Sequence, residues 1–144
     1  LRVLGSPLIR NMGTLGGNIA TASPAGDTLP ALYVLDAQVI LADAHETRML
    51  PVSDFILGPG KTALKKQEII SAVRIRKTAP DTCSHYEKAG KRKAMAIAVA
   101  SLASCLRLSL DGVIEEVRLA WGSIGPTIVT LPQIETALKG QRLH

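Results

Sequence analysis

The chain has 144 residues, and its 17 Lys and Arg against 12 Asp and Glu give a formal net charge of +5. With 47% hydrophobic and 20% charged residues, the composition argues against intrinsic disorder. No apolar run approaches the roughly 18 residues that a membrane span needs. Two cysteines, Cys83 and Cys105, are too few for a disulfide framework or a four-ligand metal site. We therefore expect a cytoplasmic protein with ordinary thiols and no metal ligands.

The positive charge is concentrated in the middle of the chain, in residues 61–93, which we call the basic belt. It carries 10 basic and 3 acidic residues, whereas residues 1–60 carry 3 and 5 and residues 94–144 carry 4 of each. A basic stripe can bind nucleic acid, but single-strand binders also need aromatic stacking surfaces, and this chain has four aromatic residues. We therefore expect no nucleic acid. A solvated face, an anionic cofactor or an acidic partner surface can each explain the belt.

In chain order, the first predicted element is a short helix from Asp27 to Leu32. Asp27 is its expected N-cap, and Pro30 falls in the first turn, where proline is tolerated. The remaining elements of the first half follow from β-branched content and from glycine and proline positions. They are strands at 37–42 and 48–52 that form a hairpin, a loop at 58–60 and a strand at 68–75.

The second half begins after a polar, proline-containing linker at 77–82. Residues 94–110 are ambiguous between a helix, which their length favours, and a strand, which their alternation favours; we predict a long strand. Asp111-Gly112 is a strong hairpin signal between this strand and its return. The other predicted elements are strands at 84–88 and 113–122 and a helix at 131–140 that ends at Gly140.

Residues 13–18 (GTLGGN) contain the main candidate for binding chemistry, although they match neither a P-loop nor the G-x-G-x-x-G fingerprint. Gly16 and Gly17 can adopt positive φ, which would turn successive N–H groups into an anion-binding concavity. The Thr14 hydroxyl and the Asn18 amide can donate to phosphate oxygens. This pattern is compatible with phosphate binding, and equally with a tight turn that binds nothing.

Asp27 offers the complementary chemistry, because an ionised carboxylate only accepts hydrogen bonds. It would be repelled by a diphosphate but suits the hydroxyl groups of a sugar or a ribityl chain. Donors for phosphates and an acceptor for hydroxyls are together what a nucleotide requires. The alternative is that Asp27 is only a helix cap.

Four motifs in order along the chain carry a family resemblance. They are residues 9–19 (IRNMGTLGGNI) with 23–27 (SPAGD), 58–62 (GPGKT) before 68–70, Tyr86-x-Lys88 with Arg92, and Glu135-x-x-Leu138-x-Gly140. Together they resemble the FAD-binding, or medium, subunit of molybdenum hydroxylases, the xanthine dehydrogenase and carbon monoxide dehydrogenase medium-subunit family.

The resemblance implies an α+β fold in two parts. Residues 1–77 would be the C-terminal part of the second FAD-binding subdomain, and residues 83–144 a C-terminal domain of antiparallel sheet plus helices. The family's first glycine-rich FAD loop, expected upstream, is absent, and the chain starts at Leu1 rather than Met. We therefore expect a fragment of a longer flavoprotein.

The resemblance also assigns cofactor-binding residues. Thr14, Leu15, Gly16, Gly17 and Asn18 match the loop on the FAD diphosphate. Three further positions match an acceptor on the FAD hydroxyls, an apolar residue against the cofactor and a polar flavin contact: they are Asp27, Ile70 and Lys88, with Glu87 as the alternative to Lys88. Where the family usually has an Asp before Ile-Ala-x-Val, this chain has Ala96, which puts any polar role there in doubt.

In such oxidoreductases the substrate is oxidised at a molybdenum cofactor in a partner subunit. Electrons then pass through the [2Fe–2S] centres of another subunit to FAD, and from FAD to NAD or another acceptor. The resemblance therefore implies a hetero-oligomer, and no catalytic acid, base or nucleophile is expected here, including His45, His85 and His144. The alternative is an inter-subunit docking module that, as an isolated and inactive fragment, does not hold FAD.

Overall fold

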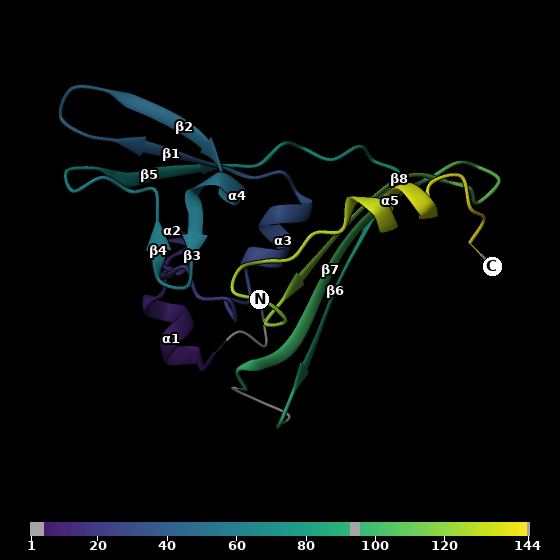
Figure 1. Ribbon diagram of the computed structural model, residues 1–144, viewed down its shortest axis with the longest axis horizontal. Helices are drawn as coiled ribbons and strands as arrows, with labels where there is room; N and C mark the ends of the chain where they lie inside the picture. Colours follow the sequence, from purple (N-terminus) through teal and green to yellow (C-terminus); the bar gives the residue numbers. More distant parts are fainter. Residues whose placement is uncertain (1–4, 93–95, 144) are drawn as a thin grey trace.

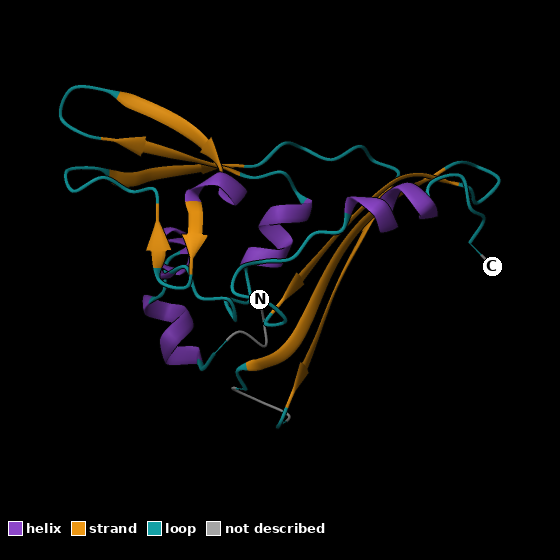
Figure 2. Cartoon of the chain, viewed as in Figure 1, coloured by secondary structure: helices purple, strands orange, loops and turns teal. Residues whose placement is uncertain are grey.

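The computed structural model describes residues 5–92 and 96–143, so that Leu1, His144 and Lys93 of the basic belt lie outside it. Over the described ranges the chain forms five helices and three antiparallel sheets (Figures 1 and 2). One three-stranded sheet belongs to the first half and another to the second, and helices pack beside both. The expected α+β fold, with an antiparallel sheet and a helix in its C-terminal part, is confirmed.

Three short helices come first: α1 (Pro7–Met12), α2 (Leu15–Thr21) and α3 (Leu29–Val34). Only α3 was predicted, and Pro30 does lie in its first turn. Hydroxyl side chains begin the other two helices: Ser6 Oγ accepts a hydrogen bond from the N–H of Ile9, and Thr14 Oγ1 accepts one from Gly17. These local caps explain how segments of only six or seven residues start helices, in α2 despite two glycines.

The first sheet has the order β2-β1-β5, with β1 at Gln38–Ala42, β2 at Thr47–Pro51 and β5 at Ile69–Arg74. Both predicted strands of the hairpin and the strand that follows are confirmed. The central strand β1 alternates, and its Val39 and Leu41 are fully buried.

Between β2 and β5 the chain forms α4 (Val52–Phe55) and a small hairpin of β3 (Ile56–Gly58) and β4 (Lys61–Thr62). The expected loop at 58–60 is the turn of this hairpin. Gly60 has a φ of +66°, a conformation that L-amino-acid side chains rarely adopt.

The second sheet consists of β6 (Thr82–Gly90), β7 (Ala98–Leu108) and β8 (Ile114–Gly122), in that order and antiparallel. β7 pairs on both sides, which decides the ambiguity of residues 94–110 in favour of a strand. Gly112, at a φ of +77°, lies in the predicted turn before β8. The final helix α5 (Pro132–Leu138) packs against β8.

The hydrophobic core is continuous across the linker. Buried residues of the first half, such as Phe55 and Leu41, belong to the same cluster as Ala103, Ala120 and Ile128 of the second half. The helix α3 makes this connection, because it lies between the two three-stranded sheets and packs against β7 and β8 (Figure 1). The second sheet is therefore held directly against the segment that contains Asp27.

Close packing of α3 depends on small residues in the second sheet. Ser101 of β7 pairs with Gly122 of β8. A Cβ atom on Gly122 would lie 2.5 Å from Ser101 Oγ and 3.0 Å from Pro30 Cγ. Only glycine therefore permits this separation between the sheet and the first turn of α3.

A buried carboxylate fixes the start of β5. The Arg48 guanidinium donates two hydrogen bonds to Glu68, from Nε to Oε1 at 2.6 Å and from Nη2 to Oε2 at 2.8 Å. The N–H of Lys65 donates a third to Oε2, at 2.7 Å. These contacts, with the Arg48 hydrogen bonds as the largest cause, lower the pKa of Glu68 from 4.5 to about 2. The strands β2 and β5 are thereby joined at this end of the sheet.

We expect Glu68→Gln to remove a pH-dependent part of the stability. Because the Glu68 pKa is lower in the folded than in the unfolded state, the ionised carboxylate stabilises the fold above about pH 4.5, and this contribution is lost as the pH falls toward 2. Urea midpoints of the two proteins should differ most above pH 4.5 and converge toward pH 2. Glu46→Gln is the control, because that exposed carboxylate lies 3.9 Å from Lys65 Nζ. A pH-independent difference for Glu68→Gln would contradict the prediction.

We expect Gly122→Ala to destabilise the chain by roughly 1–3 kcal/mol, because the new methyl group overpacks the contact between the sheet and α3. Adding Ser101→Ala removes the nearest clashing atom and should restore part of the loss. Gly58→Ala is the matched control, since a Cβ atom there meets nothing within 4 Å. Denaturant unfolding measures all four proteins, and equal stability of Gly122→Ala and Gly58→Ala would refute the packing argument.

Candidate functional site

A cavity of about 660 Å³ lies between α1, the start of α2 and residues 23–28. Its volume is in the range of small-molecule sites. Five residues predicted from the sequence line it: Thr14, Leu15, Gly17, Asn18 and Asp27. The structure thus brings the glycine-rich segment and the acidic residue together around one space, while α1, which the sequence did not predict, supplies another wall.

The start of α2 offers hydrogen-bond donors to the cavity, although not in the predicted way. Gly16 and Gly17 are helical, and neither is among the glycines with positive φ, so the predicted anion-binding turn is wrong. Thr14 caps the helix instead, with its Oγ1 2.9 Å from the N–H of Gly17. The first-turn N–H groups of Leu15 and Gly16 have no partner inside the helix. As at any helix start, these N–H groups are left to donate to a group outside the helix.

Asn18 adds another donor to the cavity. Its Oδ1 accepts a hydrogen bond from the Thr28 hydroxyl, which identifies the side-chain nitrogen as the group left to donate. The contact also joins α2 to the residue before α3. As predicted, Thr14 and Asn18 both lie where a ligand in the cavity can meet them.

Asp27 also lines the cavity, and its predicted role as helix N-cap is wrong. Thr28 occupies the N-cap position of α3, without a side-chain cap. The Asp27 carboxylate pairs instead with Lys88 of β6, with Oδ2 2.6 Å from Nζ and both side chains 15% exposed. The lysine lies 61 residues away in the sequence, so local sequence could not reveal this competition for the carboxylate.

One oxygen of Asp27 has unused acceptor capacity. Oδ1 is buried and accepts no hydrogen bond within residues 5–92 and 96–143. A turn holds the residue in place, with hydrogen bonds from Gly26 N to Ser23 O at 2.9 Å and from Ser123 N to Pro24 O at 3.0 Å. The second of these attaches the turn to the end of β8. A buried acceptor without a donor is costly, which makes Oδ1 the group most in need of a ligand hydroxyl.

The remaining predicted residues lie beside the cavity. Ile70 of β5 packs on α2, its Cγ2 3.7 Å from the position of a Cβ on Gly16. Lys88 reaches Asp27, whereas Glu87 is exposed and pairs with His85 Nε2 at 3.4 Å on the opposite face of β6. Of the two alternatives, the structure therefore brings Lys88 to the site. Ala96 lies close to Gly90 and adds no polar group.

Sequence reasoning missed Tyr86 and Ser101 as neighbours of the site. Tyr86 lies two residues before Lys88 in β6, so both side chains point to the same face. Burial, and secondarily the charge of Asp27, raises the pKa of the Tyr86 phenol. The two-residue spacing of Tyr86 and Lys88 was the signal available in the sequence. It identifies Tyr86 as a neighbour of the site only once β6 is known to face Asp27.

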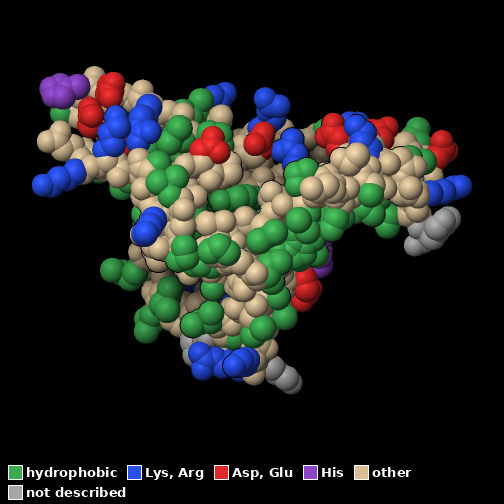
Figure 3. Space-filling view, viewed as in Figure 1, with side chains coloured by type: hydrophobic (Ala, Val, Ile, Leu, Met, Phe, Trp, Pro, Cys, Tyr) green, Lys and Arg blue, Asp and Glu red, His purple; other side chains and the backbone are tan. Residues whose placement is uncertain are grey.

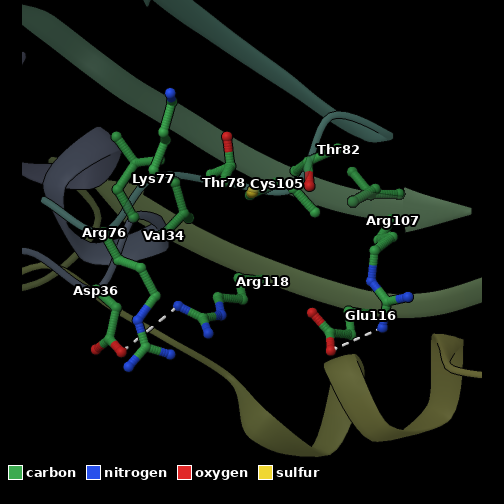
Figure 4. Close-up of a pocket in the computed structure, with 13 residues that line it drawn as sticks. Val34, Asp36, Arg76, Lys77, Thr78, Thr82, Cys105, Arg107, Glu116 and Arg118 are labelled. Atoms are coloured by element: carbon green, nitrogen blue, oxygen red, sulfur yellow. Dashed lines mark hydrogen bonds and ion pairs between the residues drawn. The ribbon is translucent and has the colours of Figure 1, made fainter.

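A second cavity, of about 220 Å³, lies where the linker crosses the second sheet (Figure 4). Arg76 and Lys77 of the basic belt line it. Its side chains also form two ion pairs, Arg118 with Asp36 at 3.7 Å and Arg107 with Glu116 at 2.9 Å. None of the predicted cofactor residues lines this cavity. It therefore lies outside the candidate site.

The basic belt is mostly a solvated surface in the described part of the chain. In Figure 3, Lys and Arg lie among Asp and Glu along the upper edge of the molecule, and a further group of Lys and Arg lies at the lower edge. Lys88 is the belt residue that contacts the candidate site through a hydrogen bond, to Asp27.

Burial raises the pKa of the Cys105 thiol, which favours its unreactive protonated form. Across the described ranges, no group of three or more His, Cys, Asp or Glu is arranged to hold a metal ion. None of the helices in the described ranges has the length and apolar character that crossing a membrane requires.

The polar groups of the first cavity fit FAD. Its diphosphate needs donors, which the start of α2, Thr14 and Asn18 provide. Its hydroxyl groups need an acceptor, and Asp27 Oδ1 is a buried acceptor that has no hydrogen-bond donor in the described ranges. Donors and an acceptor therefore line one cavity, and the two polar parts of this cofactor require both.

Comparisons with known proteins agree with this chemistry. A family model described as the FAD binding domain in molybdopterin dehydrogenase matches residues 1–77. A second, described as the CO dehydrogenase flavoprotein C-terminal domain, matches residues 84–144. The two matches together cover both three-stranded sheets.

Individual relatives are similar over almost the whole chain. The nicotinate dehydrogenase FAD-subunit of Eubacterium barkeri is 36% identical over 143 residues, covering 97% of this chain and 48% of that protein. The xanthine dehydrogenase FAD-binding subunit of Escherichia coli O157:H7 is 30% identical, covering 98% and 48%. The chain thus spans about half the length of these curated relatives.

The fold also matches a solved structure. A carbon monoxide dehydrogenase from Hydrogenophaga pseudoflava superposes with a TM-score of 0.92 at 31% identity, over 99% of this chain and 49% of that one. Because the first family model covers more than half of the residues, the chain belongs to the family of FAD-binding domains of molybdopterin dehydrogenases.

Proposed function

We propose that this chain forms one side of the FAD site of a molybdenum hydroxylase, with Asp27 as the acceptor for cofactor hydroxyls. The observation that carries the proposal is Asp27 Oδ1, which is buried, belongs to a residue that lines the cavity and has no hydrogen-bond donor in the described ranges. A ligand hydroxyl would supply the missing donor. Family membership makes FAD the cofactor that this hydroxyl belongs to.

The other predicted residues have separate roles in this proposal. The N–H groups of Leu15 and Gly16, with the side chains of Thr14 and Asn18, bind the diphosphate. Ile70 packs against α2 at Gly16. Lys88 holds Asp27 and excludes water from Oδ2. Gly17 allows the backbone approach at the first turn, where its missing side chain leaves room beside Thr14.

We further propose that residues 1–77 belong to the FAD-binding domain and residues 83–144 to a C-terminal α+β domain. The irregular linker between β5 and β6 and the two separate three-stranded sheets support this division. When bound, FAD supplies the redox chemistry, accepting electrons and passing them on.

The larger assembly is also part of the proposal. The relatives are named as FAD subunits of nicotinate and xanthine dehydrogenases, which supports a role as an oxidoreductase subunit. We infer partner subunits that carry the molybdenum cofactor and [2Fe–2S] centres, with NAD or another acceptor for the electrons. The solved relative is a carbon monoxide dehydrogenase described as lacking the Mo-pyranopterin moiety of its molybdenum cofactor.

A second candidate function is a docking module that does not hold FAD by itself. It is favoured by exposed apolar side chains on α1 at the rim of the cavity, where Leu8 is 77%, Ile9 61% and Met12 86% exposed. Half of a bipartite site loses affinity, since the missing contacts leave the cofactor solvated. The two candidates differ in whether the isolated chain retains flavin.

We expect the purified 144-residue chain to be colourless, because one wall of the cofactor site is insufficient to retain FAD through gel filtration. Visible absorbance of the eluted protein measures this directly. Stoichiometric FAD in the peak would contradict the expectation and show that the chain forms a complete site. The native assembly that contains the chain is the positive control, and it should elute with bound FAD.

We expect Asp27→Asn to weaken FAD binding by roughly 10- to 100-fold, the effect of losing a hydrogen bond to a charged acceptor. The measurement is FAD titration of the deflavinated native assembly, followed by quenching of flavin fluorescence. Asp36→Asn is the control, since that carboxylate is 68% exposed and pairs with Arg118 away from the cavity. Equal affinities of the Asp27 and Asp36 variants would refute the role of Asp27.

A further inference from the structure

Two buried polar atoms without hydrogen bonds lie at the same place in the fold. Over residues 5–92 and 96–143, Asp27 Oδ1 and Tyr86 Oη are both buried side-chain atoms with no hydrogen-bond partner. Tyr86 and Lys88 share one face of β6, and Lys88 Nζ is 2.6 Å from the other carboxylate oxygen of Asp27. The phenol and the lysine therefore approach the same carboxylate.

The sheet holds the Tyr86 ring in position. Tyr86 pairs with Ala103 of β7, and its neighbour Lys88 pairs with Ser101. Ala103 is only 1% exposed and belongs to the core, and Tyr86 packs against that core. The Tyr86 hydroxyl is buried rather than in solvent, and it lies near enough to Asp27 for the charge of that carboxylate to act on the phenol.

The energetics favour a contact between the two groups. An unsatisfied buried donor or acceptor is unfavourable by about 1–3 kcal/mol. One hydrogen bond from the phenol to Oδ1 would satisfy the phenol and use only part of the acceptor capacity of Oδ1. Burial and the charge of Asp27 raise the pKa of Tyr86, so the phenol keeps its proton and remains a donor at neutral pH. A carboxylate oxygen accepts more than one hydrogen bond, which leaves Oδ1 able to receive a ligand hydroxyl as well.

We propose that Tyr86 is a positioning residue of the cofactor site, whose hydroxyl donates to Asp27 Oδ1 and aims the carboxylate at the cofactor hydroxyl. Lys88 holds one oxygen and Tyr86 the other, so the carboxylate plane is fixed from β6 before the cofactor arrives. This inference rests on the proposed function of Asp27. It adds a residue of the second half of the chain, and an orientation, to that site.

The first test is a double-mutant cycle on the deflavinated native assembly, with FAD affinity as the readout. Tyr86→Phe should weaken binding about 3- to 10-fold, the effect of one hydrogen bond. In the Asp27→Asn background the same change should alter affinity less than about 2-fold, because Tyr86 acts through Asp27. Tyr33→Phe, the other tyrosine of the chain, is the matched control and should leave affinity unchanged.

The outcomes separate this inference from the proposed function. If Asp27→Asn weakens binding and Tyr86→Phe does not, only the positioning role is overturned. An equal loss from Tyr86→Phe in both backgrounds also overturns it, since Tyr86 would then act independently of Asp27. If Asp27→Asn has no effect, the proposed function and the inference fail together.

A second measurement needs neither FAD nor the Tyr86→Phe variant, which could fail to fold. In the 144-residue chain carrying Tyr33→Phe, Tyr86 is the single tyrosine, and its ionisation is followed by ultraviolet absorbance after a rapid pH jump. Adding Asp27→Asn removes the nearby negative charge, so Tyr86 should ionise at a lower pH. Asp54→Asn is the control, and should leave this titration unchanged. Ionisation of Tyr86 at the same pH with and without the Asp27 charge would overturn the contact.

Discussion

The ion pair between Asp27 and Lys88 is the interaction on which the candidate site depends. It joins a turn of the first half to a strand of the second, at 2.6 Å and with both side chains 15% exposed. Removing either partner would leave a largely buried charge uncompensated, so the two residues must be brought together for the halves to pack. The pair holds Oδ2 and leaves Oδ1 as a buried acceptor. The geometry of the cavity and its need for a hydroxyl donor both follow from this arrangement.

Close packing makes that ion pair possible. Lys88 pairs with Ser101, and Ser101 pairs with Gly122, so small residues continue across β7 and β8 beside the lysine. Without a side chain at Gly122, Pro30 and the start of α3 approach the sheet closely. The core is therefore shared between the two halves, although their sheets are separate. A cofactor site at this junction would be sensitive to packing changes in the second sheet, well away from the ligand.

The central positive charge has a more modest role than its size suggests. Most of the belt in the described ranges is exposed. Lys88 differs because β6 turns it inward, and two linker residues line a separate cavity with its own ion pairs. The net charge of residues 61–93 therefore located the junction between the halves, but it did not indicate that Lys88 is the side chain that pairs with Asp27.

The sequence alone determined the two hairpins, the strand at 68–75, the final helix and the family, because alternation, turn residues and motif spacing are local properties. It also identified five of the residues that line the cavity. Tertiary structure decided their roles: Thr14 caps a helix, so Gly16 and Gly17 do not form the predicted turn, and Lys88 takes Asp27 away from capping α3. Tyr86 entered the site for the same reason. Contacts between residues about 60 positions apart depend on how a strand faces a turn, and no local pattern specifies that.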